Sequence, residues 1–261
     1  MNIDLTGKRA LVCGGSQGIG KGAALSLAEC GAHITVLARD PHKLEAVVKE
    51  LNHLSPRNHQ AIAVDLLDAV ALEQAIKIAL KHASFDILVL NTGGPPPGPI
   101  SQASPDAFEK AFKMHILASQ QLTQWVLPGM KAQQYGRIIG VTSGSVRTPY
   151  PELGVSNTMR WALTAWAKTL SYEVGPFGIT VNMVMPGNID TPRLHSLLEY
   201  KAELKQMTVE ALRKTSEAQI PAQHIGSIQE IGDVIAFLAT PAAAYINGAS
   251  IPVDGGKSSV I

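Results

Sequence analysis

The run RALVC at residues 9–13, followed by GGSQGIGKGAALSLAECGA at residues 14–32, decides the fold of this chain. A short apolar stretch leads into a glycine-rich turn, and a helix-forming stretch follows the turn. Glycines allow a tight turn and let backbone N–H groups approach a pyrophosphate, which the positive end of the helix dipole also attracts. The arrangement predicts a dinucleotide site formed by Gly14, Ser16, Gly18, Ile19 and Gly20.

Short apolar and β-branched runs recur along the rest of the chain, separated by longer segments with helical periodicity. They are HITVLA (33–38), QAIAV (60–64), FDILVLN (85–91), RIIGVT (137–142), ITVNMV (179–184) and ASIPV (249–253). This alternation predicts a parallel sheet, and strands that are apolar throughout indicate helices on both faces. We therefore expect a single α/β domain over residues 1–261, with a Rossmann-type, doubly wound parallel sheet of about seven strands.

Residues 189–225 interrupt the alternation, because they are polar, helical in pattern and contain no strand. This excursion begins directly after VMPGN (184–188), which follows a strand. Open α/β sheets bind ligands at the carboxyl ends of their strands, and long excursions inside compact domains are usually functional. The segment is thus predicted to be a lid over a substrate pocket.

The composition narrows the class of protein. Lys and Arg total 22 against 21 Asp and Glu, which gives no overall field favouring nucleic acid or an anionic membrane. Cys13 and Cys30 belong to no metal-binding or disulfide pattern, and no apolar run reaches the roughly 18 residues of a membrane span. We expect a soluble cytoplasmic protein with no metal site.

The residues after the second predicted strand, LARD (37–40), bear on the choice of dinucleotide. Arg39 stands where an acidic residue would take the ribose 2′-hydroxyl of NAD, and a guanidinium suits the 2′-phosphate of NADP better. Asp40 keeps NAD open, since its carboxylate can either bind that hydroxyl or cap the helix beginning at Pro41. NADP is the preferred prediction.

Taken together, these motifs resemble those of the short-chain dehydrogenase/reductase family over essentially the whole chain. VDLLD (64–68), LNTGG (90–94), VNMVMPGNIDTP (181–192) and YINGASIPVDGG (245–256) each resemble a segment of that family. The resemblance implies that the first segment contacts adenine, the second ends a central strand and the third holds the nicotinamide. The implied cofactor residues are Asp65, Leu66, Asn91, Gly93, Pro186, Gly187, Ile189 and Thr191.

In that family a Ser polarises the substrate carbonyl, a Tyr passes the proton, and a Lys four residues later lowers the Tyr pKa and holds the nicotinamide ribose. An Asn on an earlier helix completes a proton relay. Aligning WAKTLSYEV (166–174) and FEKAFKMHILASQQLTQWVLP (108–128) with the family places these four roles, in the order Asn, Ser, Tyr, Lys, at His115, Ser143, Ser156 and Arg160. No tyrosine of the chain is followed by a lysine four residues later.

The replacements differ in what they can do. The hydroxyl of Ser156 is far less acidic than a phenol, and Arg160 can hold ribose hydroxyls but cannot exchange protons at pH 7. His115 is either an acid/base group, given an ordinary pKa near 6.5, or a hydrogen-bonded packing residue. Tyr150, in RTPYPE (147–152), is either a second proton donor or a wall of the substrate pocket.

The leading hypothesis is an oxidoreductase, similar to 3-oxoacyl reductases, that prefers NADP and acts on a small-molecule or acyl-chain carbonyl or alcohol. The resemblance also implies a homo-oligomer, a tetramer or a dimer. A second hypothesis is a cofactor-binding sensor or assembly protein without turnover. A third is a non-redox lyase or dehalogenase-like enzyme, in which Ser and Arg bind an anion.

Overall fold

A computed structural model of the chain, which describes residues 1–259, contains one seven-stranded sheet in the order β3-β2-β1-β4-β5-β6-β7. All neighbouring strands are parallel. The strands are β1 (Arg9–Cys13), β2 (His33–Ala38), β3 (Gln60–Ala63), β4 (Ile87–Leu90), β5 (Gly136–Val141), β6 (Ile179–Pro186) and β7 (Ser250–Val253). The seven predicted strands and the doubly wound fold are thereby confirmed.

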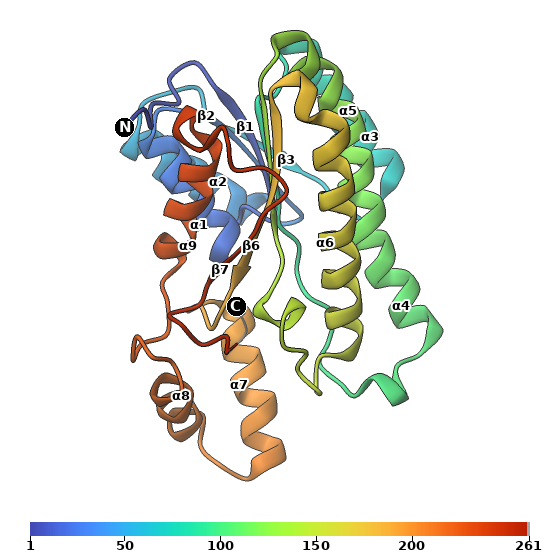
Figure 1. Cartoon of the computed structure of the whole chain (residues 1–261), viewed down its shortest axis with the longest axis vertical. Coiled ribbons are helices and arrows are strands. Elements are labelled where there is room, and N and C mark those ends of the chain that lie inside the picture. The colour runs from blue at the N-terminus through green and yellow to red at the C-terminus, as the bar shows by residue number, and fades with distance from the viewer. Residues whose placement is uncertain (260–261) are drawn as a thin grey trace.

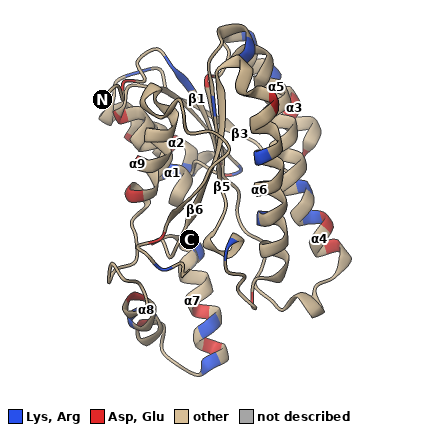
Figure 2. Cartoon of the chain, in the orientation of Figure 1, with Lys and Arg blue, Asp and Glu red and all other residues tan. Residues whose placement is uncertain are grey.

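Helices cover both faces of the sheet (Figure 1). One face is covered by α1 (Gly18–Glu29), α2 (Pro41–Leu54) and α9 (Ile228–Ala239), and the other by α3 (Ala69–His82), α5 (Ala118–Gln133) and α6 (Gly154–Val174). The short helix α4 (Pro105–Phe112) precedes α5. Charged side chains of both signs are interspersed on the outer helices (Figure 2). Within residues 1–259, no helix combines the length and apolar character that crossing a bilayer requires.

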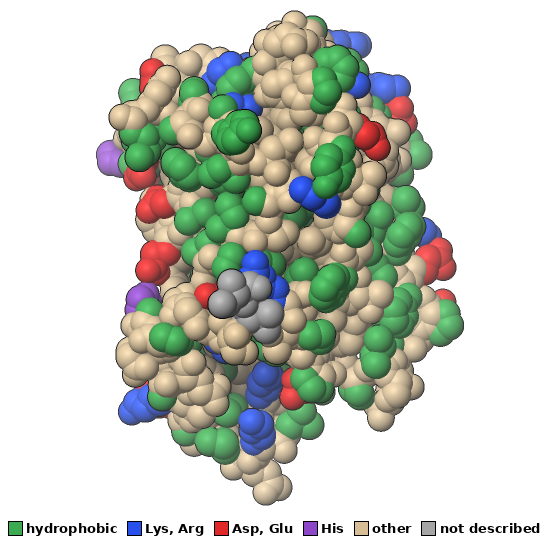
Figure 3. Space-filling model, in the orientation of Figure 1, with side chains coloured by type: hydrophobic (Ala, Val, Ile, Leu, Met, Phe, Trp, Pro, Cys, Tyr) green, Lys and Arg blue, Asp and Glu red, His purple; other side chains and the backbone are tan. Residues whose placement is uncertain are grey.

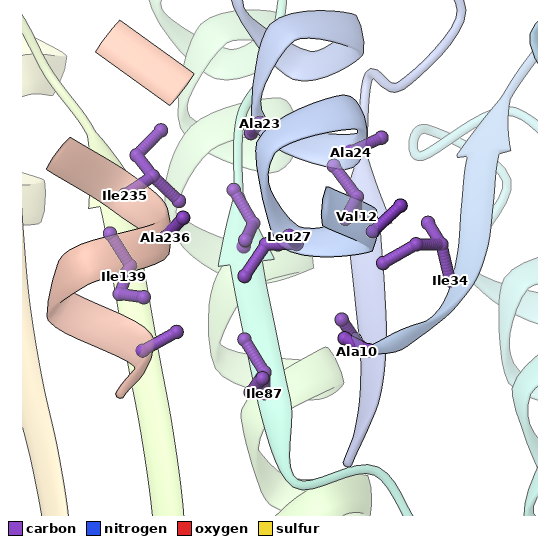
Figure 4. Packing of buried hydrophobic residues seen from close by; sticks show 14 of the residues in the cluster. Ala10, Val12, Ala23, Ala24, Leu27, Ile34, Ile87, Ile139, Ile235 and Ala236 are labelled. Atoms are coloured by element: carbon purple, nitrogen blue, oxygen red, sulfur yellow. The ribbon is translucent and has the colours of Figure 1, made fainter. Parts of the chain in front are cut away.

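The alternation of side chains along β1 divides the core into two layers. Ala10 and Val12 belong to the apolar cluster under α1 and α9, whereas Leu11 and Cys13 belong to the cluster on the opposite face. Figure 4 shows the first layer, in which Leu27 of α1 and residues of α9 lie over the strands. The sheet is therefore buried on both faces, as its continuous apolar runs require.

The predicted lid segment consists of two helices, α7 (Pro192–Lys205) and α8 (Val209–Ala218), which extend beyond the carboxyl end of the sheet (Figure 1). The chain leaves and re-enters the body at adjacent points, because Asp190 N donates to Gly226 O (2.8 Å) and Gly226 N donates to Asn188 O (2.9 Å). The segment also has an apolar cluster of its own, made of Leu194, Leu198, Ala202, Leu212, Ile220 and Ile225.

Candidate functional site

A cavity of about 1280 Å³ opens at the carboxyl edge of the sheet, beneath α7 and α8. Residues at or just after five strand ends line it, namely Gly14, Asp65, Asn91, Ser143 and Pro186. Carboxyl ends of parallel strands meet at one edge, so loops that are distant in sequence converge there. The residues that line the cavity extend from the glycine turn to α7 and α8.

The glycine turn has the geometry that a pyrophosphate site needs. Gly14 adopts a φ of +60°, a region that favours glycine, and Asn91 Nδ2 donates to Cys13 O (3.3 Å) beside it. A Cβ on Gly20 would collide with Gly14 O, so the turn and the first turn of α1 are in close contact. Helix α1 begins at Gly18, which directs its free N–H groups toward the cavity end.

At the end of the cavity near β2, Lys43 Nζ donates to Gln17 Oε1 (3.2 Å), and the other lining cation is Arg39. Its side chain is 77% exposed and its Nη1 lies 3.9 Å from Asp65 Oδ2. The neighbouring Asp40 is engaged as the N-cap of α2, where Oδ1 accepts from the backbone N–H groups of His42 (3.1 Å) and Lys43 (3.2 Å). Of the two functions considered for Asp40, the structure thus shows the helix cap.

The structure brings Ser143, Tyr150, Ser156 and Arg160 together on the wall of this cavity. Ser143 Oγ accepts from Ser145 N (3.1 Å), so it caps the turn after β5 and lines the cavity at the same time. Burial, with a contribution from the charge of Asp254, raises the pKa of the Tyr150 phenol. Tyr150 therefore carries its proton at neutral pH.

Arg160 is 8% exposed and reaches across to β5, where Nη1 donates to Val141 O. Its Nε has no hydrogen-bond partner among the described residues. Burial, with a smaller effect of the Arg193 charge, lowers the pKa of Arg160 to about 10, which still leaves the guanidinium charged at pH 7. A buried cation with unused donors is suited to binding oxygen atoms of a ligand.

His115 lies behind the cavity wall and does not line it. It is fully buried in a π-helical turn (Lys113–Leu117), where Nδ1 lies 2.6 Å from Thr92 Oγ1. Nε2 is buried without a hydrogen-bond partner among the described residues. Burial, and next the charge of Arg160, lower the pKa of His115 to about 3, so the imidazole is neutral at pH 7.

The remaining predicted cofactor residues surround the same cavity, with one exception. Gly20 is buried behind the turn, while the others contribute to the lining, namely Ser16, Gly18, Ile19, Leu66, Gly93, Gly187, Ile189 and Thr191. Thr191 also caps α7, because its Oγ1 accepts from Leu194 N (3.2 Å). No group of three or more His, Cys, Asp or Glu side chains within residues 1–259 is arranged to hold a metal ion.

Six basic residues of the lining were not predicted from the sequence, namely Lys43, Lys110, Arg193, Lys201, Lys205 and Lys257. Arg193 Nη2 donates to Pro95 O (2.6 Å), Lys257 Nζ donates to Asn188 Oδ1 (3.2 Å), and Lys201 extends from α7. One sequence signal pointed to Arg193, which directly follows the Thr191-Pro192 pair of the nicotinamide loop. Lys201 and Lys257 had no such signal, because their positions depend on how α7 and the residues after β7 pack against the body.

Comparison with known proteins agrees with this geometry. A family model described as enoyl-(acyl carrier protein) reductase matches residues 14–258. The chain is 31% identical to the 3-oxoacyl-(acyl-carrier-protein) reductase FabG of Escherichia coli (strain K12), over 99% of this chain and 100% of that protein.

Two crystal structures are similar over nearly their full length. One is the L-sorbose reductase of Gluconobacter frateurii complexed with NADPH and L-sorbose, with a TM-score of 0.94, 26% identity and full coverage of both chains. The other is YwfH, an NADPH-dependent reductase involved in bacilysin biosynthesis, with a TM-score of 0.92 and 27% identity over 97% of this chain and 99% of that one. The chain therefore belongs to the short-chain dehydrogenase/reductase family of oxidoreductases.

Proposed function

We propose that this protein is an NADPH-dependent reductase of a small-molecule or acyl-chain carbonyl compound. The observation that carries the proposal is that one cavity has the glycine turn and Arg39 at one end and Ser143, Tyr150 and Arg160 at the other. Arg39 is exposed beside Asp65, where a ribose 2′-phosphate would lie, and Asp40 is engaged as a helix cap. The NADPH named for both structural relatives supports the same cofactor.

The glycine turn and the start of α1 would bind the pyrophosphate, and the Pro186–Thr191 loop would bind the nicotinamide. When bound, the nicotinamide supplies the hydride. The Ser143 hydroxyl, on the cavity wall, would donate a hydrogen bond to the substrate oxygen and thereby favour the negative charge that develops on it. Arg160 would hold ribose hydroxyls with its unused N–H donors.

We further propose that Ser156 and Arg160 stand at the positions of the family's Tyr and Lys, and that the chain is a divergent member in this respect. Ser156 is a poor proton donor, and neutral His115 lies behind the wall. Tyr150 is the protonated phenol on the wall, so we assign the proton transfer to it. The alkoxide that forms on the substrate is a stronger base than a phenolate, so it would take the proton of the Tyr150 phenol. Solvent water would then reprotonate the Tyr150 phenolate. His115, bonded to Thr92, is assigned a positioning role.

The segment at about 189–225 would act as the lid of this site. Leu197 and Leu198 of α7 and Leu212 of α8 face the cavity, so closure would exclude water from the reacting groups.

We also infer a homo-oligomer, because Trp161 and Tyr172 of α6 are 51% and 71% exposed. The mass in solution, measured by light scattering, tests this inference. Two free cysteines, one of them buried, fit a cytoplasmic location.

The test is a titration of the purified protein with NADPH and with NADH, followed by nicotinamide fluorescence. We expect NADPH to bind more tightly, and Arg39→Ala to weaken NADPH binding by roughly tenfold or more while leaving NADH binding nearly unchanged, since one charge-assisted contact is lost. Lys49→Ala, which removes an exposed cation of α2 outside the cavity, is the control.

Failure to bind either dinucleotide would overturn the reductase proposal. NADPH binding without turnover of any carbonyl compound would instead favour a cofactor-binding sensor. Equal binding of the two cofactors with no effect of Arg39→Ala would leave the reductase but assign it to NAD and NADP alike.

A further inference from the structure

The substrate end of the cavity has an excess of positive charge. Four cations of this region, which we call the basic wall, are Arg160, Arg193, Lys201 and Lys257. Lys110 and Lys205 also contribute to the lining, whereas the lining carboxylates are Asp40, Asp65 and Asp106. The first two lie at the adenosine end with Arg39 and Lys43, so the rest of the described lining has six cations and one carboxylate, Asp106 on α4.

No member of the basic wall has a carboxylate within 4.0 Å among the described residues. The charge of Asp254 partly offsets the lowering of the Lys257 pKa, and the Asp254 carboxylate itself accepts from Gly256 N (3.0 Å) and Ser258 N (2.9 Å). Cations in partly buried positions are normally paired, because desolvation without a partner is costly. The basic wall is therefore short of negative charge.

The cations also lie near one another. Burial and then the charge of Lys201 lower the pKa of Lys257, and the charge of Arg193 contributes to the lowered pKa of Arg160. Each pair consists of residues from different elements or loops, so the folded chain holds like charges together. A bound anion would offset this repulsion.

The face of α7 that lines the cavity combines charge and apolar surface. Arg193, Leu197 and Lys201 succeed each other at intervals of four residues, which places them on one side of the helix, and Leu194 and Leu198 lie beside them. In space-filling view, basic side chains are visible over α7 with acidic ones among them, so the outer surface of this region has both signs of charge (Figure 3). A cavity wall that combines charge and apolar surface suits an organic anion better than an inorganic one.

The position of the two guanidinium groups indicates where the anionic group lies. Arg160 Nη1 bonds to Val141, two residues before Ser143, and Arg193 bonds to Pro95 in the loop after β4. Both guanidinium groups are thus held at the carboxyl ends of neighbouring strands, β5 and β4, the edge of the sheet at which Ser143 lies. The pyrophosphate and 2′-phosphate of the cofactor have their own donors, at the glycine turn and Arg39.

We propose that the substrate of this enzyme is an oxo acid, whose carboxylate is bound by Arg193 close to the reacting carbonyl, with Lys201 and Lys257 attracting it into the cavity. The proposal rests on the reductase function proposed above and specifies its substrate class. It differs from a neutral sugar or a neutral ketone in requiring the negative charge.

The experiment is calorimetric titration of the NADPH-loaded protein with 2-oxohexanoate and 3-oxohexanoate, each compared with its methyl ester. We expect at least one acid to bind roughly tenfold or more tightly than its ester, and the difference to shrink at high ionic strength. Arg193→Met should abolish the preference, Lys201→Met should reduce it severalfold, and Arg193→Lys should retain part of it. Lys214→Met, on an exposed residue of α8 outside the lining, is the control and should change nothing.

Lys201→Met provides the clean charge test, because Lys201 makes no hydrogen bond or ion pair among the described residues, whereas Arg193 also contacts Pro95 O. Acids that bind no better than their esters, or a preference that survives both substitutions, would overturn the proposal. So would a preference confined to a phosphopantetheine thioester, which would place the anion on a carrier. NADPH binding is measured separately in every variant. Intact NADPH binding without an acid preference contradicts the substrate proposal alone, and absent NADPH binding contradicts the reductase function.

Discussion

At the scale of single residues, the site depends on how burial changes the chemistry of ordinary side chains. Tyr150 lies on the cavity wall, and burial keeps its phenol protonated. His115, which its ordinary pKa would make a proton donor, becomes neutral when the fold buries it beside the cation Arg160. Residue type alone would rank the two side chains in the opposite order.

Replacing Tyr150 with Phe should lower kcat for a reduced carbonyl substrate by about 10²-fold or more, because general acid catalysis typically contributes 10²- to 10⁴-fold. NADPH affinity should stay unchanged, since the ring remains in place. Steady-state kinetics measures both effects. Tyr245→Phe, on a fully exposed tyrosine outside the cavity, is the control. A Tyr150→Phe enzyme within twofold of the wild type would assign the proton to water or another group.

His115 should make the fold sensitive to acid. Its pKa is about 3 in the folded protein and about 6.5 in the unfolded chain, so the unfolded state binds more protons between these values. The contribution is absent above pH 6.5, and stability falls as the pH drops below it, by at most about 1.4 kcal/mol per pH unit. Urea unfolding at several pH values should show a shallower loss for His115→Gln than for the wild type. Equal slopes would mean that the buried imidazole is protonated in the fold.

At the scale of elements, the contact between α1 and α9 supports the cofactor turn. Gly22 and Gly232 let the two helices touch: a Cβ on Gly232 would lie 2.5 Å from Gly22 O and from Ser26 Oγ. Helix α1 continues directly from the glycine turn, so its position determines where the free N–H groups of its first turn point. Small residues at this crossing thus act on the site from a distance.

Gly232→Ala should destabilise the protein by about 1–3 kcal/mol, because the added methyl group overpacks a close helix contact. Denaturant unfolding would measure the change. Gly98→Ala is the control, since a Cβ at Gly98 meets no atom within 4 Å, and it should stay within about 0.5 kcal/mol of the wild type. A stable Gly232→Ala variant would show that α9 can shift away from α1 at little cost.

At the scale of the whole molecule, the numbers of positive and negative side chains are nearly equal, but their distribution in the fold is uneven. The chain has 22 Lys and Arg against 21 Asp and Glu. Outside the adenosine end, however, the described lining of the cavity has six cations and one carboxylate. A local field of this kind acts on ligands that enter the cavity, whatever the net charge. The balanced composition gives no information about the charge inside the cavity.

The order of elements followed from the sequence because local patterns specify it. Seven apolar runs between helical segments, and the glycine turn after the first of them, are properties of neighbouring residues, and the structure shows each strand where its run lies. Family membership followed from the same motifs and is confirmed by the family match. The roles of individual site residues stay predictions until they are tested.

Tertiary structure decided the rest. Whether His115 faced a ligand or the core depended on how its helix packs against Thr92 and α6. The residues next to His115 in the sequence do not determine this packing. The basic wall joins residues 160, 193, 201 and 257, which line one cavity only because parallel strands present their carboxyl ends at one edge and α7 lies beside that edge. Local sequence determines the elements through backbone and burial preferences, whereas the charge environment of a site is a sum over atoms that only the folded chain brings within a few ångströms.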